Sequence, residues 1–165
     1  MPYDPDKHHR RSVRLKGYDY SQPGTYFVTI CTHQRRNLFG EIADGTMYTN
    51  DIGDAVCWIW EALPEHFAFV SLDVYIIMPN HMHALLHFVE CATNPDKRNP
   101  TLGQVIRHFK ALVSYYVHAA GKDDFAWQGR FHDHVVRTNN ASIDHIREYI
   151  LNNPAKWIED DLYSL

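Results

Sequence analysis

Hydrophobic residues occur along this chain with two different spacings. Four segments are rich in β-branched and aromatic residues or alternate between apolar and polar positions, which is typical of a β-strand with a buried face. These segments are residues 25–32, 69–78, 81–89 and 131–137. Within residues 40–49, the Asp44-Gly45 pair favours a tight turn and predicts a short hairpin.

Apolar residues at helical spacing follow three good helix caps, Asn50, Thr101 and Ser142. Gln104 completes a capping-box pattern at Thr101, and Pro154 limits the third helix. The predicted buried positions are Ile52, Val56, Ile59 and Leu63 in the first helix, Leu102, Val105, Ile106, Phe109, Leu112, Val113 and Tyr116 in the second, and Ile143, Ile146 and Ile150 in the third.

The predicted order is strand, helix, two strands, helix, strand, helix. The first six elements match the split β-α-β pattern of ferredoxin-like folds, so we expect an α+β, RRM-like fold with an antiparallel sheet. The first and third strands then lie at the centre of the sheet, and the last helix is free to cover one face. A length of 165 residues suits a single domain, in which residues 1–20 form a basic N-terminal arm and residues 140–154 the last helix.

Composition narrows the class of protein. Hydrophobic residues make up 45% of the chain, which suits a globular domain. The 3 cysteines share no C-x-x-C spacing, so we expect neither a disulfide framework nor a zinc knuckle, and infer a reducing compartment. The sequence shows neither a signal peptide nor an apolar stretch that would span a bilayer. We therefore expect a cytoplasmic protein without a membrane partner.

Charge is unevenly distributed. The net charge of −4 argues against indiscriminate nucleic-acid binding. Basic residues nevertheless gather near the start of the chain, at Lys7, Arg10, Arg11, Arg14 and Lys16. Such a cluster either solvates the N-terminus or follows a phosphate backbone, and both interpretations stay open.

Candidate chemistry centres on His81 and His83, which flank Met82 in the third predicted strand. Alternate side chains of a strand point to the same face, so the two imidazoles can converge while Met82 enters the core. Neutral imidazole is a common metal ligand. The alternative is a pair of partly buried histidines without a ligand.

The last helix adds a second group of polar side chains. His145, Tyr149 and Asn153 occur four residues apart and form one stripe. If this helix covers the histidines, Asn153 can offer an amide oxygen and Tyr149 a phenol. A hard oxygen ligand beside two imidazoles suits Mg²⁺ or Mn²⁺, while zinc usually has a stronger third ligand in catalytic sites. A nearby cation would make the phenol a better nucleophile; the alternative is an ordinary amphipathic tyrosine.

Three sequence blocks occur together and in order: Pro-Asn-His-Met-His at residues 79–83, Trp-Gln-Gly-Arg-Phe-His-Asp-His-Val-Val-Arg at 127–137, and Ile-Arg-Glu-Tyr-Ile-Leu-Asn-Asn-Pro at 146–154. With the opening residues 14–20 and 27–31, the chain resembles the REP-associated tyrosine transposases. These form a branch of the single-tyrosine HUH nuclease superfamily and are similar to transposases of insertion sequence 200. The resemblance covers most of the chain.

The resemblance implies an activity and assigns roles. His81, His83 and Asn153 match the metal ligands, with Mg²⁺ or Mn²⁺ as the cofactor, and Tyr149 matches the nucleophile. The implied enzyme is a metal-dependent endonuclease and strand-transferase that forms a 5′-phosphotyrosine link. Its implied substrate is single-stranded DNA beside a palindromic hairpin. Insertion-sequence relatives act as dimers with exchanged helices and REP-associated ones as monomers, so monomer and homodimer both stay open.

Basic residues in several segments are candidates for DNA contacts. The resemblance places the N-terminal segment near bound DNA, two candidates lie on the polar face of the second helix, and two flank the second H-x-H sequence, His132-Asp133-His134. The predicted DNA-binding residues are Arg10, Arg11, Arg14, Lys16, Arg107, Lys110, Arg130 and Arg137.

Several alternatives remain at this point. The chain could be a hairpin-binding module without catalysis, or a zinc hydrolase that acts on small substrates. His132 and His134 rank below His81 and His83 as metal ligands, and Tyr115 is a minor rival to Tyr149 as nucleophile.

Overall fold

The computed structural model of the chain describes residues 14–90, 98–137 and 140–163. Its centre is an antiparallel four-stranded sheet in the order β4-β5-β1-β6. The strands are β1 (Gly24–Cys31), β4 (Val70–Met78), β5 (His81–Phe88) and β6 (His132–Val136). The first and third strands of the predicted fold, β1 and β5, lie in the middle of this sheet, as the sequence predicts.

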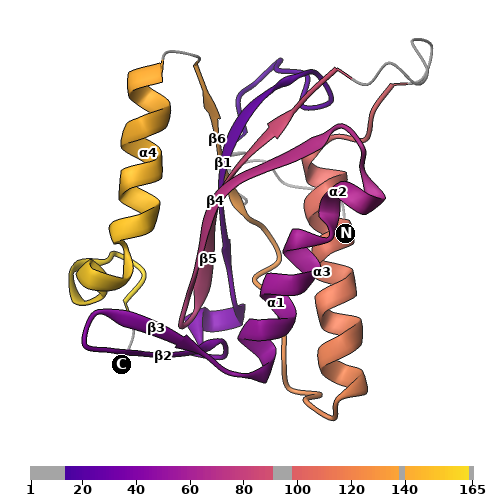
Figure 1. Cartoon of the computed structure of the whole chain (residues 1–165). Helices are drawn as coiled ribbons and strands as arrows, with labels where there is room; N and C mark the ends of the chain where they lie inside the picture. The colour runs from indigo at the N-terminus through magenta and orange to yellow at the C-terminus, as the bar shows by residue number, and fades with distance from the viewer. Residues whose placement is uncertain (1–13, 91–97, 138–139, 164–165) are drawn as a thin grey trace, which may run out of the picture.

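Helices cover both faces of the sheet (Figure 1). One face carries α1 (Asp51–Glu61), α2 (Leu63–His66) and α3 (Leu102–Ala119). The opposite face carries α4 (Asn140–Asn152), which leads into the 3₁₀ segment η2 (Pro154–Glu159). A second 3₁₀ turn, η1 (His33–Arg35), follows β1. The small hairpin of β2 (Gly40–Ala43) and β3 (Thr46–Thr49) lies below the sheet in this view. The α+β fold class predicted from the sequence is confirmed.

One face of the sheet buries more apolar side chains than the other. The larger core fills the space between the sheet and α1 and α3, and Val28, Met82, Trp60 and Phe109 belong to it. A smaller cluster under α4 contains Leu85, Val136 and Ile150 as its buried members. The smaller cluster leaves room on the α4 face for polar groups.

Local sequence signals explain most element boundaries. The Asn50 side chain accepts hydrogen bonds from the backbone amides of Ile52 and Gly53 at the start of α1. Thr101 and Gln104 form the predicted capping box of α3. Asp44 and Gly45 both have positive φ, at 50° and 71°, as the turn between β2 and β3 requires.

Two predictions at helices are wrong. Ser142 lies inside α4, because this helix begins at Asn140. Tyr116 is 45% exposed and packs edge-on against Trp58, while Val117 is buried. The buried stripe of α3 thus continues through Val117, and the amphipathic tyrosine beside it stays at the surface. Most of the predicted N-terminal arm, residues 1–13, and residues 91–97 of the predicted loop lie outside the described residues.

Candidate active site

His81 and His83 lie on the central strand β5 and face α4. Both are buried, and Met82 between them enters the larger core. In the sheet, His81 pairs with Cys31 and His83 with Thr29 of β1. The i, i+2 spacing therefore brings both imidazoles to one face, and their Nε2 atoms lie 3.1 Å apart.

Asn80 determines the proton position on His81. The Asn80 amide nitrogen donates to the carbonyl oxygens of Arg35 and Leu162, at 3.2 and 2.8 Å. Its Oδ1 atom is then the acceptor for Nδ1–H of His81, at 2.7 Å. The lone pair of His81 Nε2 therefore points toward His83 and is available to a cation.

His83 has an equivalent partner on the neighbouring strand. Its Nδ1 lies 2.8 Å from the hydroxyl oxygen of Thr29, which can accept the Nδ1 proton and leave Nε2 free as a ligand. Burial lowers the pKa of both imidazoles, and the neighbouring His83 contributes to the effect at His81. Both rings are therefore neutral at pH 7, which is the form that binds metals.

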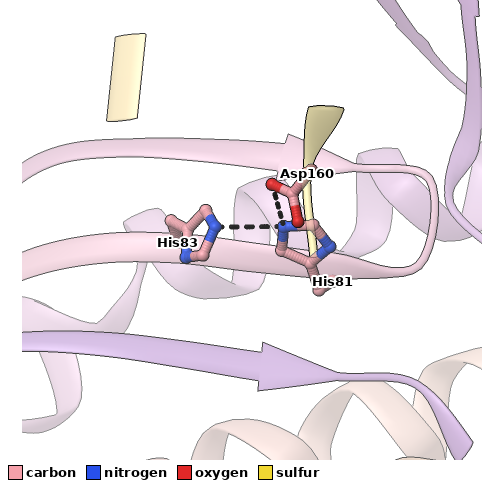
Figure 2. Close-up of side chains that lie close together, drawn as sticks. All are labelled: His81, His83 and Asp160. Carbon is pink, nitrogen blue, oxygen red and sulfur yellow. Dashed lines mark hydrogen bonds and ion pairs between the residues drawn. The ribbon is translucent and has the colours of Figure 1, made fainter. Parts of the chain in front are cut away.

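A carboxylate completes this cluster. Oδ2 of Asp160 lies 4.0 Å from His81 Nε2, and the ligand atoms of His81, His83 and Asp160 all lie within 4.8 Å of one another. Figure 2 shows the two imidazoles directed toward each other, with the carboxylate beside His81. Two neutral imidazoles and one carboxylate form a donor set that fits a divalent cation.

The segment that carries Asp160 is fixed over the histidines. Trp157 of η2 packs against the His81 ring, with 5.9 Å between ring centroids, and Tyr163 packs against Trp157. Asp160 Oδ1 accepts a hydrogen bond from the amide of Leu162, which leaves Oδ2 directed at His81. Asp160 was not among the residues predicted from the sequence, where it stands in the acidic run 159–161, a pattern that usually marks a solvated surface.

Tyr149 stands beside the second histidine. Its ring lies 5.4 Å from the His83 ring between centroids, and it also contacts Phe27 of β1. The side chain is 47% exposed, so a substrate can reach it. Burial and the Asp160 carboxylate raise the pKa of Tyr149, while a hydrogen bond from Asn153 opposes that rise.

Asn153 lies at the junction between α4 and η2. Its backbone keeps helical dihedral angles, φ −59° and ψ −42°, although Pro154 follows it. Its side chain is buried, and its Oδ1 atom has no hydrogen-bond partner among the described residues. An unpaired buried carbonyl oxygen at this position fits a cation in the same site.

A cavity of about 640 Å³ joins most of these groups, but the fully buried His81 is not among the described residues that line it. His83, Tyr149 and Asn153 line it together with Asp160 and Lys156. His132 and His145 also line it, so the first histidine of the second H-x-H sequence reaches the site. His134 is exposed and pairs with Phe27 farther along β1.

The predicted DNA-binding residues separate into three groups. Arg14, Arg107, Lys110 and Arg130 line one cavity of about 630 Å³ beside α3, on the opposite face of the sheet. Lys16 and Arg137 are exposed but are not among the described residues that line either cavity. Arg10 and Arg11 lie outside the described residues.

Tyr115, the rival nucleophile, lies on α3. Its side chain is 69% exposed and contacts Tyr116. Because α3 and α4 cover opposite faces of the sheet (Figure 1), Tyr115 is separated from the histidines by the sheet. Within the described part of the chain, each helix is too short or too polar to cross a membrane.

Comparisons with known proteins identify a related protein and a similar solved structure. No family model matches the sequence. An uncharacterised protein of Haemophilus influenzae is 38% identical over 175 residues, which cover 98% of this chain and 97% of the relative. Among solved structures, a REP-associated tyrosine transposase bound to a REP hairpin is similar in fold. Its TM-score is 0.57 at 20% identity, over 87% of this chain and 72% of that one. The chain therefore belongs to the family of the Haemophilus influenzae protein and has a fold like that of the REP-associated tyrosine transposases.

Proposed function

We propose that this protein is a metal-dependent, transposase-like enzyme that cuts and rejoins single-stranded DNA, with Tyr149 as nucleophile. The observation that carries this proposal is the position of the half-exposed Tyr149 ring against His83, in a cavity that His83, Asn153 and Asp160 also line. The Tyr149 phenol and the candidate cation ligands His83, Asp160 and Asn153 thus face the same cavity.

The metal would be held by Nε2 of His81 and His83, with oxygen ligands from Asp160 and Asn153. This combination of nitrogen and hard oxygen donors suits Mg²⁺ or Mn²⁺. A bound divalent ion would supply Lewis-acid polarisation of a non-bridging phosphate oxygen. Asn80 and Thr29 would keep the two imidazoles in the orientation that the ion needs.

Tyr149 would carry the covalent step. Its phenol oxygen forms a bond to phosphorus and the bond from phosphorus to the 3′ oxygen breaks, which leaves a 5′-phosphotyrosine link and a free 3′-hydroxyl. The phenol proton is lost and the departing 3′ oxygen gains one. The Asn153 hydrogen bond favours the ionised phenol. Because the link conserves the energy of the phosphodiester, another 3′-hydroxyl can reverse the step without ATP.

The basic cavity beside α3 is the proposed contact for a DNA hairpin. Arg14, Arg107, Lys110 and Arg130 place four cationic side chains around it, and cations of this kind bind backbone phosphates. The structural neighbour was solved with a REP hairpin, which supports the choice of ligand. Arg14 also lies over the Phe131 ring, at 5.3 Å from its centroid.

A cleavage assay tests the enzyme directly. End-labelled single-stranded hairpin DNA from the flanks of the protein's own gene would be incubated with Mg²⁺ or Mn²⁺ and wild-type protein, Tyr149→Phe or Tyr115→Phe. We expect a denaturation-resistant protein–DNA adduct with wild type and Tyr115→Phe, and none with Tyr149→Phe. Binding by Tyr149→Phe should stay close to wild type, since the ring is kept.

Other outcomes assign the site differently. An adduct that persists in Tyr149→Phe and disappears in Tyr115→Phe would transfer the nucleophile to α3. Tight hairpin binding without any adduct would favour a non-catalytic module. Activity restricted to zinc and to small substrates would favour the hydrolase alternative.

A further inference from the structure

Helix α4 presents different side chains on its two flanks. Ile146 and Ile150 form its apolar stripe and pack toward the sheet. Tyr149 lies on the flank toward β1 and contacts His83 and Phe27. Arg147 lies on the other flank, toward β4. The nucleophile and this arginine are therefore on opposite sides of the same stripe.

Arg147 is tied to the sheet by an ion pair. Its Nε and Nη2 atoms donate to the Asp73 carboxylate, with the shortest contact of 2.6 Å from Nη2 to Oδ2. Its Nη1 atom donates to Asp144, one turn earlier in α4, at 2.9 Å. The Asp73 side chain is 11% exposed, whereas that of Asp144 is 70% exposed. Because two guanidinium nitrogens of Arg147 bind the less exposed carboxylate, the contact with Asp73 restricts the arginine's orientation more than the contact with Asp144 does.

Asp73 and its neighbour Val74 both face α4. The pairing of β4 with β5 shifts register between Leu72 and Tyr75. Leu72 packs in the larger core, so regular alternation turns Asp73 toward α4, and the shift places Val74 in the cluster under the same helix. In a regular strand, consecutive side chains would point to opposite faces.

His87 and Thr25 hold the Asp73 carboxylate in place. Its Oδ2 atom accepts a hydrogen bond from Nε2 of His87 at 2.9 Å, and Nδ1 of His87 accepts from the Thr25 hydroxyl at 2.8 Å. The connection from Thr25 through His87 and Asp73 to Arg147 crosses β1, β5, β4 and α4. These hydrogen bonds therefore fix Arg147 relative to β1 and β5, the strands that carry Thr29 and His83.

The apolar stripe alone resists rotation of α4 weakly. Isoleucine contacts are non-directional, so a small roll of the helix about its axis keeps most of them. With a helix radius of about 5–6 Å including side chains, a roll of about 20° moves a side-chain tip by about 2 Å. A misplacement of about 1 Å can reduce a catalytic rate by about 100-fold.

We propose that Asp73 and Arg147 are positioning residues that fix the rotation of α4 and hold the Tyr149 phenol beside the histidine pair. The catalytic part of this inference rests on the proposed function, while the structural part concerns the chain alone. Neither residue lines the cavity that contains Tyr149 among its described residues, so their effect is transmitted through the helix.

Two acidic partners of the same arginine provide a matched test. Asp73→Asn weakens the contact to the sheet, and Asp144→Asn weakens the contact within α4. Each variant would carry 3-fluorotyrosine at position 149, and its fluorine resonance would be recorded without metal or DNA. We expect Asp73→Asn to shift or broaden this resonance, because the ring loses its fixed contact with His83, and Asp144→Asn to leave it near the wild-type position.

Kinetics test the consequence for the reaction. With the hairpin substrate and Mn²⁺, we expect Asp73→Asn to lower the single-turnover rate of adduct formation at least about tenfold, with the hairpin Kd within about twofold of wild type. Arg147→Lys, which keeps the charge but not the fork, should fall between Asp73→Asn and wild type. Asp144→Asn should react at the wild-type rate.

The opposite results overturn the proposal. Wild-type resonance and rate in Asp73→Asn would do so, and so would equal losses in Asp73→Asn and Asp144→Asn. If Asp73→Asn does not fold, Arg147→Gln replaces it with the same expectations and the same contrary outcome. If wild type forms no adduct with any substrate, the proposed function fails, and the fluorine comparison alone then decides whether the ion pair positions the tyrosine.

Discussion

Asn80 connects two parts of the candidate site through one amide group. Its nitrogen holds the backbone of Leu162, in the segment that brings Asp160 to the histidines, and its oxygen orients the His81 ring. A residue that looks like a turn former between two strands in the sequence is therefore fully buried in the structure. Replacing this amide would disturb the imidazole and the carboxylate segment together.

Burial of the two imidazoles makes stability depend on pH. An unfolded chain binds protons on both rings below pH about 6.5, whereas the folded chain keeps them neutral because burial lowers their pKa. The unfolded state binds more protons in that range, so the free energy of unfolding falls as pH decreases, by up to about 1.4 kcal/mol per pH unit for each histidine.

This pH dependence can be measured by urea unfolding with EDTA at pH 7, 6 and 5. We expect His81→Gln to lose about one histidine's share of the slope between pH 6 and 5. Substitution of the exposed His134 by Gln is the control and should keep the wild-type slope. An unchanged slope in His81→Gln would contradict the argument.

At the residue scale, the sequence identifies side chains that regular elements bring together. His81 and His83 converge because a strand has period two. Tyr149 and Asn153 are four residues apart, and both line the cavity that His83 lines, as a shared helical stripe predicts. Asp160 reaches the same place through a 3₁₀ segment and a turn. No periodicity connects it to the histidines, which is why the sequence alone does not assign it.

At the level of elements, the sequence predicts helix caps, but it does not predict irregular strand pairing. Asn50 and Thr101 are cap residues followed by strong apolar stripes, and both helices begin where predicted. The last helix starts at Asn140, ahead of Ser142, because several polar residues in succession offer competing starts. The register shift in β4 depends on pairing with β5, and a strand pattern in one segment carries no information about that pairing.

The Asn50 cap gives a stability prediction. Its Oδ1 atom accepts hydrogen bonds from two backbone amides at 3.0 Å each, and its Nδ2 donates to the carbonyl of Leu38. Asn50→Ala should therefore lower the free energy of unfolding by about 1–2 kcal/mol. Chemical denaturation measures this change, and Asn50→Asp, which keeps the acceptor, should recover most of it. Equal losses in both variants would contradict the cap assignment.

Across the whole molecule, opposite faces of one sheet carry different chemistry. The cavity with Tyr149 lies under α4, and the basic cavity lies beside α3. Phe131 and His132 are adjacent in the chain and line one cavity each, at the start of the edge strand β6. The element order predicts the sheet and its two faces, whereas the cavities depend on side chains from several segments and appear only in the folded structure.

Local charge, and not the net charge of −4, should control DNA binding. If the basic cavity binds the hairpin, log Kobs should fall linearly with log salt concentration, and Arg107→Ala should reduce the magnitude of the slope by about 1. Arg36, which pairs with Asp124, is outside the residues that line either cavity. Arg36→Ala is thus the control, and a slope that changes equally in both variants would assign the hairpin to another surface.

The register shift beside Asp73 has a consequence at the edge of the sheet. β4 is at one end of the sheet order, and its sequence is rich in valine and isoleucine. A long, regular and apolar edge strand is a template on which another chain can add its own strand, and this is a common route to aggregation. The irregular pairing and the Asp73 carboxylate interrupt that template within β4. We therefore expect this edge to resist association, strand to strand, with other copies of the chain.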